Sequence, residues 1–202
     1  MVRATRSRWA TSIAAVGQLV VVVSVAGCTT PGGTGIEASG PATTANITPA
    51  AGKTSAEVSP KVGFQAPDFA LQDPDGNTVR LSDFRGRPVF INFWTTWCTA
   101  CKEEMPLIQA SFNDHKAQGH DPVFLAVDVK EDAQTVRQFV QAGGYNWTMV
   151  LDTGADIFVN KYKGSAFPTS YFIDREGIIR GVRIGGVTRQ ILEGRLNLIN
   201  TW

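Results

Sequence analysis

The sequence predicts an α/β fold in which helices flank a central mixed β-sheet, with a β-hairpin extension on the N-terminal side. Two continuous apolar runs, 88–93 (PVFINF) and 122–129 (PVFLAVDV), are typical of strands buried on both faces of a sheet. A helix-length segment separates these runs, as in a strand–helix–strand unit with parallel strands. Two closely spaced strand candidates and a terminal helix follow later in the chain, so we expect antiparallel pairs as well.

The individual elements follow from local patterns. The turn sequence Asp73-Pro-Asp-Gly76 lies between two short strand candidates, 68–72 and 78–81, and predicts the β-hairpin. A helix is expected over 99–117, ending near Gly119. The remaining expected elements are a helix at 133–141 that Gly143 and Gly144 end, a strand at 148–151, a short helix at 156–162, strands at 170–174 and 178–182, and a helix at 188–199.

Length and composition exclude several function classes. Of the 202 residues, 43% are hydrophobic and 18% are charged, which supports a packed core and excludes a wholly disordered chain. The formal net charge of +1 provides no broad basic surface, so we expect no nucleic-acid partner. Three cysteines are too few for a disulfide-stapled miniprotein, and two histidines leave little material for a histidine-rich metal site.

Residues 1–27 have the features of an export signal. Arg3, Arg6 and Arg8 precede an apolar run over 13–26, which is shorter than the roughly 20 residues that a membrane-spanning helix needs. The run ends in Val25-Ala26-Gly27-Cys28, which resembles the lipobox of bacterial lipoproteins, where the signal is cut before a cysteine that becomes lipidated. This resemblance implies a lipid anchor on Cys28 and a location on the extracytoplasmic side of the cell membrane, in the periplasm or at the cell exterior. The alternative is an uncleaved anchor with an incidental cysteine.

The segment 28–60 is expected to be the lipidated cysteine followed by a flexible linker. Between residues 29 and 60, 25 of the 32 residues are Ala, Gly, Pro, Ser or Thr, and none is aromatic. Such a composition cannot bury enough apolar surface to order itself. The remaining residues, 61–202, have the length of one ordinary domain.

The sequence Cys98-Thr-Ala-Cys101 lies between the first buried strand and the helix that follows it. Two intervening residues place both sulfurs on the same side of the first helical turn, close enough for a disulfide. The helix N-terminus stabilises a thiolate and lowers the pKa of Cys98, and the thiolate is the form that attacks disulfides. This pattern favours thiol–disulfide exchange. The alternatives are an inert structural disulfide and a zinc site, which would need two further ligands although His115 and His120 are the only histidines.

Four motifs in residues 62–200 occur together. They are Gly63-Phe-Gln-Ala-Pro-Asp-Phe69, Phe93-Trp-Thr-Thr-Trp-Cys98, Cys101 with Glu104 and Pro106 after it, and Phe167-Pro-Thr-Ser-Tyr-Phe-Ile-Asp174. With them the chain resembles thioredoxin-like proteins, specifically the membrane-anchored TlpA/ResA type of thiol-disulfide oxidoreductase. The resemblance implies a thioredoxin-like fold, an exposed nucleophile at Cys98 and a resolving thiol at Cys101. It implies no metal and no cofactor beyond this redox-active pair.

The same resemblance assigns roles to residues around the cysteines. Pro168 matches the family's cis-proline, which faces the disulfide and leaves backbone groups free to pair with a substrate strand. Trp97, Phe167 and Thr169 are expected to contact the substrate. For Trp97, packing in the core is an equal alternative to shielding the sulfur.

Two residues of the helix after Cys101 are also singled out. Pro106 is expected to bend the helix, a structural role. Glu104 matches a family glutamate that lies close to the cysteines, so we expect it to be partly buried, with a raised pKa, and to exchange protons with Cys101. The alternative is a solvated Glu104.

The implied activity is the reduction of disulfides in exported proteins such as apocytochrome c. A membrane thiol reductase of the DsbD/CcdA kind is implied as electron donor, because disulfides persist outside the cytoplasm and a reductant there needs an electron supply. In one departure from the family, Ala100 stands where a proline usually precedes the second cysteine. The resemblance therefore does not carry over a reduction potential.

Two other functions are compatible with parts of the sequence. An AhpC/TSA-type peroxiredoxin shares the opening motif and has a threonine three residues before its cysteine, as Thr95 is here, but it has proline where this chain has Ile91. A non-enzymatic copper or haem-assembly chaperone would need a third metal ligand near the cysteines. His115 or His120 would have to supply it, and both are expected to be solvated.

Overall fold

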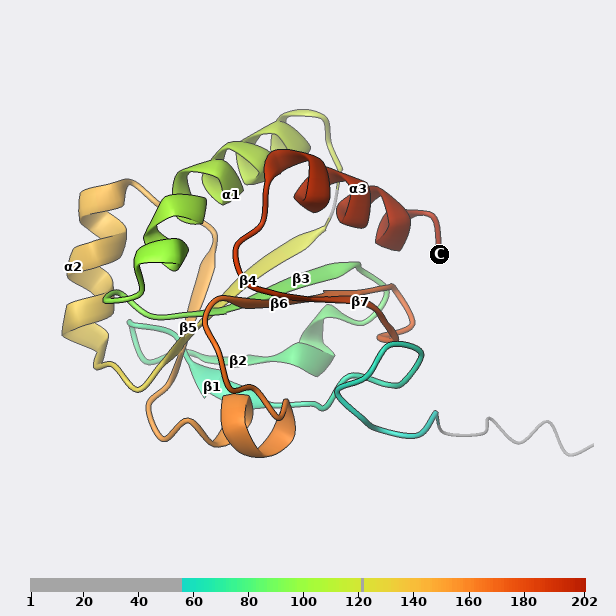
Figure 1. Ribbon diagram of the computed structural model, residues 1–202, viewed down its shortest axis with the longest axis horizontal. Helices are drawn as coiled ribbons and strands as arrows, with labels where there is room; N and C mark the ends of the chain where they lie inside the picture. The colour runs from blue at the N-terminus through green and yellow to red at the C-terminus, as the bar shows by residue number, and fades with distance from the viewer. Residues whose placement is uncertain (1–55, 121) are drawn as a thin grey trace, which may run out of the picture. The chain divides into compact units, whose positions relative to one another are not determined.

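The computed structural model describes residues 56–120 and 122–202, which contain one seven-stranded β-sheet and three α-helices (Figure 1). The predicted export signal, Cys28 and the predicted linker up to residue 55 lie outside the described residues. Within the described ranges, no helix combines the length and the apolar composition that crossing a lipid bilayer requires.

The sheet is mixed, as predicted, with the strand order β2-β1-β5-β4-β3-β6-β7. The pairs β3·β4 and β4·β5 are parallel, and the other four neighbouring pairs are antiparallel. The strands are β1 (Ala70–Gln72), β2 (Thr78–Arg80), β3 (Val89–Trp94), β4 (Val123–Val129), β5 (Thr148–Asp152), β6 (Thr169–Ile173) and β7 (Ile179–Ile184). The two apolar runs of the sequence form β3 and β4, and every residue of these two strands is buried.

The predicted hairpin is present. β1 and β2 pair antiparallel, with Leu71 opposite Val79. The Asp73 carboxylate accepts hydrogen bonds from the backbone N–H groups of Asp75 and Asn77, each at 2.9 Å, which closes the turn. Gln72 pairs with Leu151 of β5, so the hairpin extends the central sheet rather than standing apart from it.

The helices begin and end close to the predicted positions. α1 (Thr99–Ala117) has the predicted bounds and contains Pro106. α2 (Ala133–Gly143) ends at Gly144, whose left-handed backbone (φ 67°) suits glycine. α3 (Arg189–Asn200) follows β7. Two short helical turns complete the chain: a 3-10 turn, η1 (Leu81–Phe84), which the sequence analysis did not include, and a π-helical turn, η2 (Asp156–Lys161), at the predicted short helix.

The sheet separates two apolar cores. On one face, α1, α2 and α3 contribute Ile108, Val136 and Leu192, which pack with side chains of the sheet. The other core contains Phe69 from the segment before β1 and Phe158 from η2. Figure 1 shows α1 and α3 on one side of the sheet and the 156–161 turn on the other. The second face is thus covered by short turns and extended chain, and no α-helix of the described residues contributes to that core.

Candidate functional site

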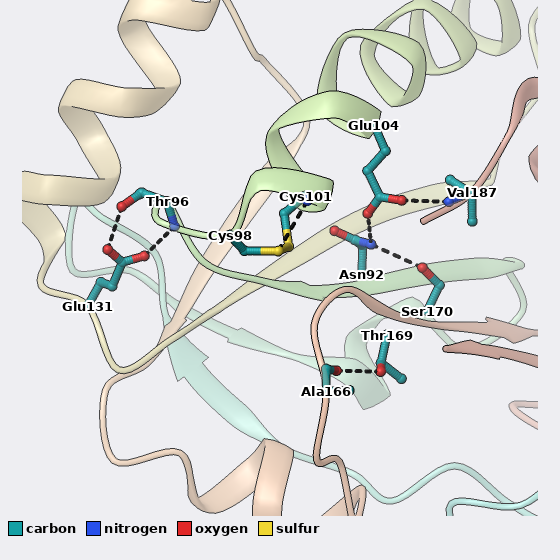
Figure 2. Close-up of a disulfide and its surroundings, with 10 residues drawn as sticks. All are labelled: Asn92, Thr96, Cys98, Cys101, Glu104, Glu131, Ala166, Thr169, Ser170 and Val187. Atoms are coloured by element: carbon teal, nitrogen blue, oxygen red, sulfur yellow. Dashed lines mark hydrogen bonds between the residues drawn. A yellow bond between two sulfur atoms is a disulfide. The ribbon is translucent and has the colours of Figure 1, made fainter. Parts of the chain in front are cut away.

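The two cysteines lie where the chain leaves β3 and enters α1. Cys98 is the N-cap residue of α1, and its Sγ atom accepts a hydrogen bond from the backbone N–H of Cys101 at 3.2 Å. The two residues form a disulfide, with their Cα atoms 5.2 Å apart (Figure 2). The predicted pairing is therefore present. Cys98 thus lies at the helix N-terminus, where the sequence analysis expected it.

The two sulfur-bearing residues differ in access. Cys98 is 8% exposed, whereas Cys101 is fully buried. Of the pair, only Cys98 has surface that an incoming disulfide can reach. The geometry is therefore compatible with the predicted order, in which Cys98 attacks and Cys101 resolves.

Glu104 lies one helical turn after Cys101 and is buried, with 3% of its surface exposed. Its carboxylate accepts a hydrogen bond from Asn92 Nδ2 of β3 at 2.9 Å and one from the backbone N–H of Val187 at 2.7 Å (Figure 2). Burial raises the pKa of Glu104 to about 7, although these two hydrogen bonds and the positive charge of Arg183 act to lower it. The solvated alternative is wrong, and the burial is more complete than predicted.

Asn92 connects Glu104 to the sheet, and sequence reasoning assigned it no role. Its Nδ2 group also donates to Ser170 Oγ at 3.0 Å, so β3, α1 and β6 meet at one polar contact. A signal was present in the sequence, because Asn92 is the one polar residue in the apolar run 88–93. A buried polar side chain in such a run needs a partner, which the fold brings from distant segments.

The peptide bond between Phe167 and Pro168 is cis, as the resemblance implied. Among the described residues, the backbone N–H and C=O of Phe167 have no hydrogen-bond partner. Thr169 is buried, and its hydroxyl donates to the carbonyl of Ala166 at 2.7 Å. The side chain of Thr169 is therefore engaged within the loop, whereas the backbone of Phe167 is available to another chain.

Trp97 projects from the surface next to Cys98. It is 66% exposed, and its ring meets the ring of Phe167 edge to face with centroids 5.9 Å apart. The core-packing alternative for Trp97 is therefore wrong. Both rings line an apolar groove of about 200 Å³ that Phe158, Val159 and Lys130 also border.

Glu131, which the sequence analysis did not consider, contacts the cysteine loop from another element. Its carboxylate accepts hydrogen bonds from the backbone N–H and the hydroxyl of Thr96, both at 2.5 Å. Figure 2 shows Glu131 and Glu104 on opposite sides of the disulfide. No sequence pattern signalled this contact, because the two residues are 35 positions apart.

Comparison with known proteins agrees with this geometry. The model of the AhpC/TSA family matches residues 62–182. The thiol-disulfide oxidoreductase ResA of Bacillus subtilis is 38% identical over 68% of this chain and 75% of its own length. The chain belongs to the AhpC/TSA family, among its ResA-type thiol-disulfide oxidoreductases.

Further relatives of ResA type support the assignment. ResA of Geobacillus kaustophilus is 38% identical over 68% of this chain and 78% of its own length. A solved structure from Chlorobium tepidum, assigned to the thiol:disulfide interchange protein DsbE, superposes with a TM-score of 0.63 at 27% identity and covers 69% of this chain and 98% of its own. The thioredoxin-like fold predicted from the motifs is confirmed. The AhpC/TSA model does not by itself separate this activity from the peroxiredoxin alternative, but the ResA relatives favour the oxidoreductase.

The histidines of this ResA-type chain lie far from the disulfide. His115 is 5% exposed, and its Nε2 atom lies 3.0 Å from the Glu193 carboxylate, so the expectation that it is solvated is wrong. α1 has 19 residues, so its C-terminal end, which carries His115, is about 25 Å from Cys98. The His120 ring lies 5.4 Å from that of His115. Neither histidine can therefore complete a metal site with the cysteines, as the chaperone alternative requires.

Proposed function

We propose that this protein is a lipid-anchored, extracytoplasmic reductase of protein disulfides, with Cys98 and Cys101 as its redox pair. The observation that carries the proposal is the disulfide at the N-terminus of α1, in which only Cys98 has exposed surface. The anchoring part rests on the lipobox-like sequence that ends at Cys28.

The reaction begins with the reduced pair. The Cys98 thiolate attacks one sulfur of a substrate disulfide and forms a mixed disulfide with it, while the substrate S–S bond breaks and the other substrate sulfur leaves as a thiolate that takes up a proton. Cys101 then loses its proton and attacks Cys98, which forms the Cys98–Cys101 disulfide and releases the second substrate thiol. Two electrons pass from the protein to the substrate in these steps.

Glu104 is suited to receive the Cys101 proton in the second step. It follows Cys101 on the same face of α1, and burial raises its pKa to about 7. A carboxyl group with that pKa is populated in both protonation states near neutral pH, which is what a general acid–base group requires.

The substrate chain has a place to bind beside Cys98. The unpaired backbone groups of Phe167 can form β-type hydrogen bonds with an extended segment. The groove that Trp97, Phe158 and Val159 line can receive an apolar side chain of that segment. Exported disulfide-containing proteins, with apocytochrome c as one candidate, fit this description, and a DsbD/CcdA-type membrane reductase would restore the reduced pair.

Trapping tests the proposed function in the native host. In the variant Cys101→Ser, the mixed disulfide between Cys98 and a substrate cannot be resolved, so we expect exported proteins bound through Cys98. The matched control is the double variant with Cys98→Ser as well, which should capture none. Mass spectrometry of the mature N-terminus should find acyl chains on Cys28, and an unmodified Met1 would refute the anchor.

The purified protein distinguishes the enzyme classes. We expect it to accelerate the reduction of insulin disulfides by a dithiol and to leave hydrogen peroxide unconsumed. Peroxide turnover with a sulfenic acid at Cys98 would instead favour the peroxiredoxin alternative. Glu104→Gln should slow the release of the mixed disulfide by about 10²-fold or more, whereas Glu103→Gln, an exposed acid one residue away, should leave the rate unchanged.

A further inference from the structure

The contact between Glu131 and Thr96 joins the loops that follow the paired strands β4 and β3. Glu131 lies between β4 and α2, and Thr96 lies two residues before Cys98. Both carboxylate oxygens of Glu131 are used, one by the Thr96 N–H and one by its hydroxyl, at 2.5 Å each. Hydrogen bonds to a carboxylate are among the stronger ones in proteins. Thr96 is therefore held at two points.

Glu131 lies between two ordered elements, β4 and α2. The next residue, Asp132, is the N-cap of α2 and accepts a hydrogen bond from the Thr135 N–H at 2.9 Å. Val129, two residues before Glu131, ends β4 and is paired with Asp152 of β5. The carboxylate is thus attached to a short loop between two ordered elements rather than to a long free segment.

A second acid, Asp128, lies close to Glu131. Asp128 lies opposite Trp94 in the parallel register of β4 and β3 and is fully buried. Burial, followed by a side-chain contact with Glu131 and the charge of Glu131, raises the pKa of Asp128 to about 9. Asp128 is therefore neutral at pH 7.

We propose that Glu131 is a positioning residue of the redox reaction, which holds Thr96 so that the Cys98 loop keeps the conformation of the closed disulfide. The inference rests on the proposed function only in that the Cys98–Cys101 pair cycles between dithiol and disulfide. In reduction the pair takes up two electrons and two protons and the S–S bond breaks. A contact that favours the closed form makes this uptake less favourable. Glu131 therefore keeps the pair more strongly reducing.

The reduction potential of the purified full-length chain, measured by equilibration with reduced and oxidised glutathione, tests the proposal. Glu131→Ala removes both hydrogen bonds, and we expect the equilibrium to move about tenfold toward the dithiol, which is roughly 30 mV for a two-electron couple. Thr96→Val removes one of the two bonds and should move the equilibrium about threefold in the same direction. Glu131→Gln should restore most of the wild-type value, because its amide can accept from the Thr96 N–H and donate to the Thr96 hydroxyl.

Two comparisons separate positioning from a purely structural role. A residue that only supports the fold would destabilise the oxidised and reduced proteins equally, so the potential would stay the same. Glu103→Ala removes an acidic residue that is exposed on α1. The equilibrium constant between the dithiol and disulfide forms of this variant should stay within twofold of the wild-type value. The proposal is overturned if Glu131→Ala and Thr96→Val both leave the potential unchanged, or if Glu131→Gln behaves like Glu131→Ala. Since the measurement uses no protein substrate, it is independent of whether trapping in the host succeeds.

Discussion

Replacing Glu104 by glutamine should change how the stability of the oxidised protein depends on pH. Burial raises the pKa of Glu104 from its ordinary value of 4.5 to about 7 in the folded protein. Between these two pH values the folded state binds the proton and the unfolded state does not. The free energy of unfolding therefore falls as pH rises from 4.5 to about 7. Glutamine does not titrate, so this fall should disappear in Glu104→Gln.

The magnitude follows from the size of the pKa shift. One pKa unit corresponds to about 1.4 kcal/mol, so the shift from 4.5 to about 7 costs the wild type about 3 kcal/mol of stability above pH 7 relative to pH 4.5. Glutamine has its own cost, because its amide nitrogen must face one of two donors, Asn92 Nδ2 or the Val187 N–H. This unmatched donor costs about 1–3 kcal/mol at every pH. At pH 4.5 the free energy of unfolding of Glu104→Gln should be clearly lower than that of wild type. At pH 8 wild type has lost about 3 kcal/mol and the variant has not, so the difference between the two proteins should shift by about 3 kcal/mol in favour of the variant.

Urea unfolding of the oxidised proteins between pH 4.5 and 8 measures this gap. Glu103→Gln serves as the control, because Glu103 is exposed and its replacement should leave the pH dependence unaltered. Other buried acids such as Asp128 are present in both proteins, so their contributions cancel in the difference. If the stabilities of wild type and Glu104→Gln run parallel over the whole pH range, Glu104 does not titrate as described and its role in proton exchange fails with it.

Three further predictions concern other parts of the domain. Trp97→Ala should change the unfolding free energy by less than about 1 kcal/mol, since the ring is 66% exposed, but should slow insulin reduction more than reduction of a small aromatic disulfide; equal slowing of both would contradict substrate contact. Asp128→Asn should remove a loss of stability that wild type shows as pH rises from 3.8 toward the folded-state pKa of about 9, because over this range the folded protein holds a proton that the unfolded chain releases; urea unfolding at pH 5 and 8 checks this, and identical pH dependence of the two proteins would refute it. Phe93→Ala should destabilise by about 3–5 kcal/mol, because Phe93 is fully buried among the rings of Phe158, Tyr162 and Tyr171; a loss below about 1 kcal/mol in urea unfolding would contradict that packing.

The strands and helices were predictable because their signals are local. A continuous apolar run indicates a strand buried on both faces, and β3 and β4 follow the two runs closely. Asp132 and Thr188 accept hydrogen bonds from the first turns of α2 and α3, and Gly144 takes the left-handed conformation that ends α2. Each of these features depends on residues within one or two turns of each other. The 3-10 turn η1 was missed because it is a single short turn with no apolar periodicity of its own.

The redox pair was also predictable from residues close together in the sequence, whereas the side chains around it come from distant segments. The spacing of Cys98 and Cys101 determined that their sulfurs can bond, and the helix start after them determined which sulfur caps the helix. The resemblance to ResA-type proteins pointed to Glu104. It did not show that Asn92 and Val187, 12 and 83 positions away, would both donate to its carboxylate.

The sequence by itself determined the sheet, the helices and the chemistry of a C-x-x-C pair, because periodicity, capping and short spacing act between near neighbours. Only the tertiary structure decided that Trp97 is exposed, that His115 is buried against Glu193, and that Glu131 accepts a hydrogen bond from Thr96. Exposure, the pKa of a buried acid and hydrogen bonds between distant loops depend on which segments cover a residue. Which segments bury a residue is decided only when the whole chain packs, so no local sequence pattern predicts it.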